Sequence, residues 1–168
     1  MRVAVALGSN LGDRLANLRL ARGKIEQIPG VKAPFLASAI YETRPVGCEP
    51  GAGDFLNAVI EFEYDGDPAA LLRSLAAAEV ALGRPAGHRR NVSRIIDFDI
   101  LYAGDIERDD DGIQLPHPRL HERRFVLQPL SDIRPGLVLP GRQKSVRELL
   151  ASLPESDKVA CLTSDWSS

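Results

Sequence analysis

Cysteine and long hydrophobic runs are both scarce in this chain of 168 residues. Its two cysteines, Cys48 and Cys161, lie far apart with no C-x-x-C or metal-finger spacing, which favours unpaired thiols in a reducing compartment over a structural disulfide. No segment approaches the ~20 apolar residues that a membrane-spanning helix needs. The apolar N-terminal stretch is too short for a secretion signal and is interrupted at Gly8. We therefore expect a cytoplasmic protein.

A surplus of positive charge is missing as well. The chain has 21 Lys and Arg against 23 Asp and Glu, so its net charge of −2 gives no global attraction to nucleic acid or to an anionic membrane. It has only five Phe, three Tyr and one Trp, and no R-G-F-x-F motif, which disfavours a single-strand RNA-binding module. Any phosphate binding must therefore come from local clusters of basic side chains.

The order of predicted elements defines a fold class. An apolar share of 44% suits one domain spanning residues 1–168. Periodicity and capping signals predict strands at 2–7, 35–43, 55–64 and 94–102, a helix after Asn10 or Asp13 that ends at Pro29, and a second helix from Asp67 to Gly83. This β-α-β-β-α-β order predicts a ferredoxin-like α+β sandwich with a largely antiparallel sheet. An extra hairpin around 107–112 and short C-terminal helices, one opened by a capping box at Ser145, complete it.

Two carboxylates interrupt the apolar strand R94-I-I-D-F-D-I-L-Y102. In a strand, Asp97 and Asp99 point to the same face about 6.6 Å apart. Two like charges there destabilise the fold unless a cation lies between them, and carboxylate oxygens are the ligands that Mg²⁺ prefers. The alternative is an exposed edge strand with both aspartates solvated, and the D-x-D pattern alone does not decide between the two.

Arginines on both sides of this strand favour the metal interpretation. One basic cluster precedes the strand (Arg84, His88, Arg89, Arg90, Arg94) and a second follows the hairpin (His117, Arg119, His121, Arg123, Arg124). Guanidinium groups bind phosphate oxygens in pairs, so carboxylates for metal beside arginines for phosphate indicate phosphoryl transfer from a nucleotide. The G8-S-N-L-G12 loop matches neither common phosphate-binding glycine motif, and we interpret it as a tight strand-to-helix turn.

Several motifs, in order, carry a resemblance to a known family. They are A6-L-G-S-N-L-G-D13, Y41-E-T-R-P-V-G47, F55-L-N-A-V59, E79-x-x-L-G-R84, R94-I-I-D-F-D-I-L101, L115-P-H-P-R119 and R123-R-F-V-L-Q-P-L130. The chain resembles the 6-hydroxymethyl-7,8-dihydropterin pyrophosphokinases of folate biosynthesis along nearly its full length. The resemblance implies transfer of the β,γ-diphosphate of ATP to the pterin hydroxymethyl group, with release of AMP. Another metal-dependent nucleotidyl or phosphoryl transferase using the same D-x-D is the alternative.

The resemblance also implies roles for individual residues. Asp97 and Asp99 match the pair that binds two Mg²⁺ ions, and with Arg84 and Arg94 they form the implied catalytic set. Asn57 matches the residue that hydrogen-bonds the pterin amide edge, between two ring-stacking aromatics. The implied pterin-binding set is Thr43, Pro45, Val46, Gly47, Phe55, Asn57 and Phe125. The implied ATP-binding set is Leu72, Glu79, Arg84, Arg90, Arg94, Ile100, Gln114, His117 and Arg123.

The implied partners are these small-molecule substrates alone, with no nucleic acid and no membrane, and we expect a monomer. Two segments depart from the family pattern. Around the second basic cluster, Pro118 follows His117 where an aromatic is often found, and Gly112 stands where an arginine is possible. The loop before the D-x-D strand reads R90-N-V-S-R94, where the family usually has R-W-G-P-R.

Overall fold

The computed structural model of the chain describes residues 1–45, 50–83, 93–110, 112–155 and 159–167. Eight strands, three α-helices of ten or more residues, one short α-helix and one 3₁₀ turn occur in these ranges. In chain order they are β1 (Arg2–Ser9), α1 (Arg14–Glu26), β2 (Val31–Ala37), β3 (Ile40–Thr43), β4 (Phe55–Tyr64), α2 (Pro68–Ala81), β5 (Asp97–Ala103), β6 (Arg108–Asp110), β7 (Ile113–Leu115), a 3₁₀ turn (Leu120–Glu122), α3 (Arg124–Ile133), α4 (Val146–Ala151) and β8 (Ala160–Thr163). None of the helices described here is long and apolar enough to cross a membrane.

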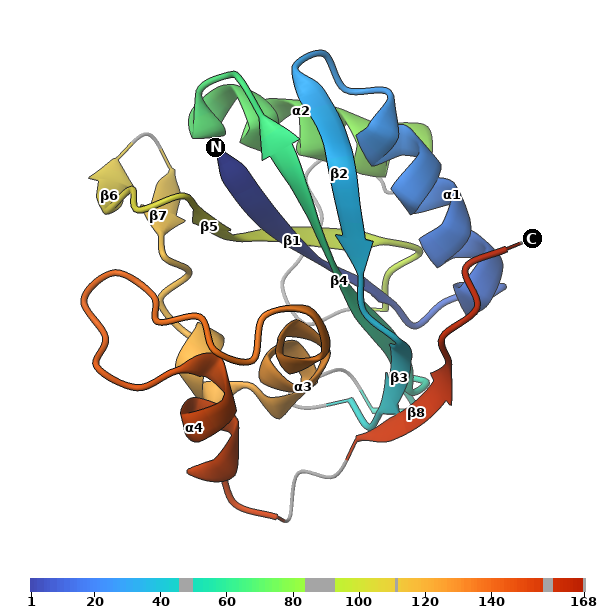
Figure 1. Ribbon diagram of the computed structural model, residues 1–168. Coiled ribbons are helices and arrows are strands. Elements are labelled where there is room, and N and C mark those ends of the chain that lie inside the picture. Colours follow the sequence, from blue (N-terminus) through green and yellow to red (C-terminus); the bar gives the residue numbers. More distant parts are fainter. Residues whose placement is uncertain (46–49, 84–92, 111, 156–158, 168) are drawn as a thin grey trace.

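The main sheet has the strand order β5-β1-β4-β3-β8, with β2 pairing to the same strand β4 as β3 does (Figure 1). Every pairing in it is antiparallel. Strands β6 and β7 form the separate predicted hairpin. The sheet therefore has the connectivity expected of the β-α-β-β-α-β sandwich, and the predicted fold class is confirmed.

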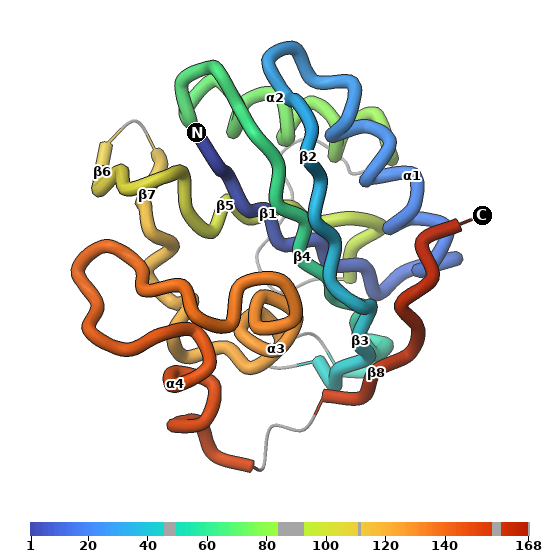
Figure 2. Tube along the Cα trace, viewed as in Figure 1, coloured from blue at the N-terminus to red at the C-terminus, as the bar shows by residue number. Residues whose placement is uncertain are grey.

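Helices cover both faces of the sheet, as the traces in Figures 1 and 2 show. Strand β1 alternates large and small residues, so that Val3, Val5 and Leu7 pack in one hydrophobic cluster with α1 and α2. The small residue Ala4 faces the other way, into a second cluster built with α3 and α4. The site-bearing face is therefore lined by small side chains on its central strand, which leaves room above it.

The capping signals in the sequence place the helices correctly. Asp13 caps α1, accepting the Ala16 N–H at 3.0 Å, and Asp67 caps α2 with Pro68 at the first helical position. Gly83 follows α2 with φ of +104°, a conformation that favours glycine. The capping box of Ser145 and Glu148 is confirmed.

Two predicted strands need correction. The strand expected at 35–43 is two strands, β2 and β3, because the Ser38 hydroxyl accepts the Val59 N–H at 2.9 Å where a ladder carbonyl would otherwise do so. The strand expected at 94–102 begins only at Asp97 and extends to Ala103. The edge strand β8 was not predicted from the sequence. Its Cys161 is a free, exposed thiol, and Cys48 lies outside the described residues.

Candidate active site

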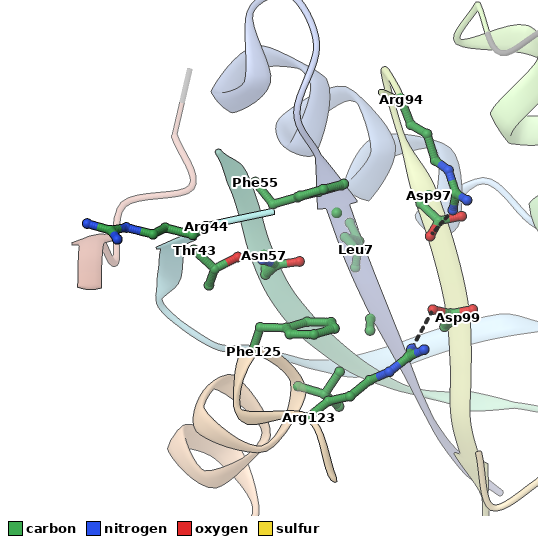
Figure 3. A pocket seen from close by; sticks show the side chains of 13 residues that line it. Leu7, Thr43, Arg44, Phe55, Asn57, Arg94, Asp97, Asp99, Arg123 and Phe125 are labelled. Atoms are coloured by element: carbon green, nitrogen blue, oxygen red, sulfur yellow. Dashed lines mark hydrogen bonds and ion pairs between the residues drawn. The ribbon is translucent and has the colours of Figure 1, made fainter. Parts of the chain in front are cut away.

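A cavity of about 150 Å³ opens on the α3 side of the sheet, where β1, β4 and β5 lie side by side (Figure 3). Side chains from both predicted ligand sets meet there. The cavity is lined by Ala6, Leu7, Gly8, Thr43, Arg44, Phe55, Asn57, Arg94, Asp97, Asp99, Arg123, Phe125 and Val126. The structure therefore brings the acid pair and the implied pterin pocket into one continuous space.

Strand register explains this juxtaposition. Gly8 on β1 is the Cα partner of Asp97 on β5 and of Asn57 on β4, so the three residues form a row across the sheet. Neighbouring strands lie ~4.8 Å apart, so the carboxylate of Asp97 and the amide of Asn57 project from positions about 10 Å apart. Glycine between them keeps the space above the row open.

The two aspartates each face an arginine. Arg94 Nη1 lies 2.7 Å from Asp97 Oδ2, and Arg123 Nη1 lies 3.9 Å from Asp99 Oδ2. The side chains of Asp97 and Asp99 are 25% and 40% exposed, so both carboxylates are accessible to water. As predicted, both carboxylates lie on one strand face with cationic neighbours. They are too exposed to carry the full free-energy cost of burying a charge, and each is too close to an arginine to be only solvated.

This donor set fits Mg²⁺. The ion prefers hard oxygen ligands and is usually held by one or two carboxylates, with water and substrate phosphates completing its shell. Asp97 and Asp99 supply such a pair, and the described part of the chain has no group of three or more His, Cys, Asp or Glu side chains that would form a closed protein cage. The site is suited to a metal that arrives with a phosphate.

The other half of the cavity is formed by two aromatic rings and the side-chain amide of an asparagine. Phe55 and Phe125 extend into it from β4 and from the first turn of α3 (Figure 3). Between them, Asn57 donates from Nδ2 to Thr43 Oγ1 at 2.7 Å, which fixes the orientation of the amide. Its Oδ1 and second N–H remain for a ligand edge that presents a donor beside an acceptor.

The second basic cluster adds a neutral donor beside the cations. His117 Nδ1 accepts the Arg119 N–H at 3.1 Å, so the ring proton is on Nε2. Burial, together with the charges of Arg123 and Arg119, lowers the pKa of His117 to about 4, although Asp97 opposes this shift. Burial also lowers the pKa of Arg123, whose guanidinium lies 5.6 Å from the centre of the Phe125 ring. His117 is thus an uncharged donor at neutral pH.

Asn10 holds the segment that leads into β5, the strand of Asp97 and Asp99, by hydrogen bonds to Arg94. Its backbone N–H donates to the Arg94 carbonyl at 3.0 Å, and its side-chain Oδ1 accepts the Arg94 N–H at 2.6 Å. Its Nδ2 donates to the Gly53 carbonyl at 3.3 Å. The G8-S-N-L-G12 loop, predicted to be only a tight turn, therefore also joins the segments that carry Arg94 and Phe55.

His117 and four other members of the implied ATP set are not among the residues that line this cavity. Leu72 and Ile100 pack in the cluster on the opposite face of the sheet, and Glu79 accepts the Phe98 N–H at 2.8 Å. Gln114, on β7, is exposed and bonds Asp109. Their nucleotide role stays a prediction. Pro45 is described but does not line the cavity, and the remaining implied residues, Val46, Gly47, Arg84 and Arg90, lie outside the described residues, as does the divergent segment 90–92.

Sequence reasoning missed five cavity residues: Ala6, Leu7, Gly8, Arg44 and Val126. The large-small alternation of V3-A-V-A-L-G8 was the available signal, because small residues repeating on one strand face indicate that something else occupies that face. Gly8 shows the reason: an added Cβ would lie 3.2 Å from Asn57 Oδ1 and 3.6 Å from the Phe55 ring.

One cavity of this α+β fold combines paired carboxylates, arginines and a flat aromatic pocket. This combination defines a phosphate-transferring enzyme that acts on a planar acceptor. Comparison with known proteins identifies the family. Residues 4–135 match the family model described as 7,8-dihydro-6-hydroxymethylpterin-pyrophosphokinase (HPPK), and the chain belongs to this family.

Named relatives agree with this assignment. The 2-amino-4-hydroxy-6-hydroxymethyldihydropteridine pyrophosphokinase of Methylorubrum extorquens is 39% identical over 155 residues, covering 92% of this chain and 95% of that protein. The enzyme of the same name from Bacillus subtilis is 40% identical over 129 residues, covering 77% and 75%. Folic acid synthesis protein fol1 of Schizosaccharomyces pombe is 33% identical over 150 residues, and the chain spans only 20% of its length.

Solved structures share the fold. The HPPK-DHPS of Plasmodium falciparum with pteroate superposes with a TM-score of 0.69 at 14% sequence identity, covering 89% of this chain and 42% of that one. An HPPK-DHPS in complex with substrates gives 0.69 at 15% identity, covering 90% and 44%. The chain thus spans less than half of these solved chains, and at this identity the likeness concerns the fold alone.

Proposed function

We propose that this protein transfers the β,γ-diphosphate of ATP to the hydroxymethyl group of 6-hydroxymethyl-7,8-dihydropterin, giving AMP and the pterin diphosphate, a step of tetrahydrofolate biosynthesis. The observation that carries the proposal is the single cavity in which Asn57, in strand register with Asp97, lies together with Asp99, Phe55 and Phe125. Membership of the pyrophosphokinase family supports the same reaction. We expect a cytoplasmic monomer that acts on these small molecules.

The acceptor half binds and orients. The pterin ring would lie between Phe55 and Phe125, with its amide edge against Asn57 and its hydroxymethyl group toward Asp97 and Asp99. Stacking between two aromatic rings buries the flat bicyclic pterin at little entropic cost, and the hydrogen bonds of the Asn57 amide fix the orientation of the pterin in its plane. Holding the attacking oxygen in place in this way accounts for a large part of the acceleration available to a two-substrate reaction.

The donor half binds and neutralises phosphate. Arg94 and Arg123 would pair with phosphate oxygens, and His117 would add an uncharged N–H from Nε2. Asp97 and Asp99 would hold two Mg²⁺ ions that travel with ATP. When bound, the metal supplies Lewis-acid neutralisation of phosphate charge and eases ionisation of the attacking hydroxyl.

The deciding experiment is to incubate the protein with ATP, Mg²⁺ and 6-hydroxymethyl-7,8-dihydropterin and to identify the nucleotide product. AMP whose formation depends on the pterin is expected. ADP, or no turnover, would reject the proposal. ADP in particular would identify a different phosphoryl transferase with the same carboxylates.

Replacing Gly8 by alanine should raise the KM for the pterin by about tenfold, because the new methyl group crowds the Asn57 amide and the Phe55 ring. The KM for ATP should change little. Steady-state kinetics with each substrate varied in turn measures both. Gly23→Ala is the matched control, because a Cβ at Gly23 on α1 meets no atom within 4 Å. An unchanged pterin KM in Gly8→Ala would mean that Asn57 does not bind the acceptor.

Replacing His117 by leucine should lower kcat/KM for ATP by about tenfold, the effect of one lost hydrogen bond to a charged group. Glutamine can still donate and should retain most of the activity. Because His117 has its pKa near 4, it stays neutral at neutral pH, so the pH–rate profiles of His117→Gln and the wild type should run parallel from pH 6 to 8. Profiles that diverge there would show that His117 acts as a titrating acid or cation.

A further inference from the structure

The cavity has two walls that come from different layers of the fold. Asn57 and Phe55 lie on β4 and Thr43 on β3, whereas Phe125 and Val126 lie in the first turn of α3. The distance between the two walls of the cavity therefore depends on the position of α3 relative to the sheet. A flat ring is sensitive to that distance, because stacking contacts weaken within an ångström.

The first turn of α3 is weakly held by the helix itself. Its N-cap residue, Arg123, makes no side-chain capping hydrogen bond within the described structure. Pro129 lies inside the helix four residues after Phe125, and proline has no N–H to donate to the Phe125 carbonyl. Contacts from outside the helix must therefore fix the position of the Phe125 ring.

A buried phenol on the opposite wall supplies such a contact. Tyr41 on β3 is 8% exposed, and its OH lies 2.9 and 2.8 Å from the two carboxylate oxygens of Asp132 on α3. The Ala39 N–H donates to the same carboxylate at 3.2 Å. Burial and Asp132 raise the pKa of the Tyr41 phenol, so it keeps its proton and donates. Gln128, one turn earlier on α3, opposes this rise in the pKa.

This contact lies next to the acceptor pocket. Tyr41 is the Cα partner of Asn57 across the β3–β4 pair, so it continues the row that starts at Asp97 and runs through Gly8. Directly opposed residues of antiparallel strands have neighbouring side chains on one face. The Tyr41–Asp132 hydrogen bond therefore joins α3 to the strand pair at the position of the ligand-facing amide.

We propose that Tyr41 and Asp132 are positioning residues for the acceptor, because their hydrogen bond sets the separation between the Phe125 wall and the Asn57 wall. The inference rests on the proposed function and concerns how the pterin site is built. Neither side chain lines the cavity, so the effect is exerted through the two walls.

The test is steady-state kinetics of Tyr41→Phe, Asp132→Ala and Asp132→Asn with the pterin and ATP varied separately. Tyr41→Phe and Asp132→Ala should each raise the pterin KM about tenfold, the factor that corresponds to one lost charge-assisted hydrogen bond, and leave the KM for ATP unchanged. Asp132→Asn keeps an acceptor for the phenol and should recover most of that loss. The double variant Tyr41→Phe with Asp132→Ala should be no worse than either single change.

Tyr102→Phe is the matched control. Like Tyr41, Tyr102 on β5 is buried, donates to a carboxylate, that of Glu61, and does not line the cavity. Unlike Tyr41, it is not needed to connect its carboxylate to α3, because the pairing of Glu61 with Arg134 at the end of α3 remains without it. Its pterin KM should stay at the wild-type value even if its melting temperature falls. Equal increases of the pterin KM in Tyr102→Phe and Tyr41→Phe would overturn the inference, because both would then reflect a general loss of packing and not a specific effect on the pterin site.

The assay separates the two proposals. Wild-type protein that forms no pterin-dependent AMP would reject the proposed function, and the positioning inference would fall with it. Wild-type activity together with unchanged pterin KM values in Tyr41→Phe and in Asp132→Ala would reject the positioning inference alone. Should Tyr41→Phe fail to fold, the comparison of Asp132→Ala with Asp132→Asn decides the same question, since it leaves the buried phenol in place.

Discussion

Replacing either Asp97 or Asp99 by asparagine is expected to lower kcat by about three orders of magnitude. Asparagine keeps the size of the side chain and one oxygen but loses the negative charge that a metal–phosphate complex requires. The two carboxylates are neighbours on one strand face, each beside an arginine, so each variant also removes a negative charge next to a cation. Electrostatic complementarity to the incoming ATP is therefore lost at the reacting end of the cavity.

Stability should change far less than activity. Both carboxylates are partly exposed, and ion pairs of this kind contribute about 1 kcal/mol or less to folding. Thermal unfolding, Mg²⁺ dependence and AMP formation should be measured for each variant. Asp110→Asn in the β6–β7 hairpin is the matched control, because Asp110 also pairs with an arginine, Arg108, but lies outside the cavity. Near-wild-type turnover in Asp97→Asn or in Asp99→Asn would show that the pair does not hold the metal.

Local sequence signals were sufficient for most of the fold. The alternation in β4 predicted that Leu56, Ala58 and Ile60 face one way and Asn57 the other, as the two clusters and the cavity confirm. Asp67, Pro68 and Gly83 marked the ends of α2 because capping and positive φ are properties of single positions. The common face of Asp97 and Asp99 followed from the two-residue period of a strand.

Long-range contacts could not be predicted in the same way. The break between β2 and β3 depends on a hydroxyl of Ser38 that bonds Val59, a residue 21 positions away in the sequence. Strand β8 pairs with β3 although more than a hundred residues separate them. No local pattern shows which strand edge such a segment joins, because pairing depends on the rest of the sheet.

The candidate site has the same division. The acid pair and its arginines were visible in the sequence as chemistry, and the resemblance named Phe55, Asn57 and Phe125. What the sequence could not show is the position of α3, which brings Phe125 opposite β4. The open floor at Gly8 was overlooked for a related reason, since a missing side chain becomes informative only when its cross-strand partners are known.

Replacing Arg94 by alanine is expected to lower kcat by about two orders of magnitude, the effect of removing one donor that stabilises developing charge. Its guanidinium is only 17% exposed and is held beside Asp97 by one ion pair, while its Nε makes no hydrogen bond within the described residues. Its backbone is fixed by Asn10 at both N–H and C=O. The group is therefore placed at the reacting end of the cavity with a donor to spare.

Lysine in place of Arg94 should recover only part of the activity, because an ammonium group keeps the charge but lacks the planar fork that binds two phosphate oxygens. Steady-state kinetics of Arg94→Ala and Arg94→Lys, with ATP and the pterin varied separately, measures this order. Arg22→Ala is the matched control, since Arg22 pairs with Glu26 on α1, outside the cavity. A wild-type kcat in Arg94→Ala would move the phosphate-binding role to other arginines of the chain. Equal activity of the lysine and arginine forms would show that charge alone, without the fork, is what the reaction needs.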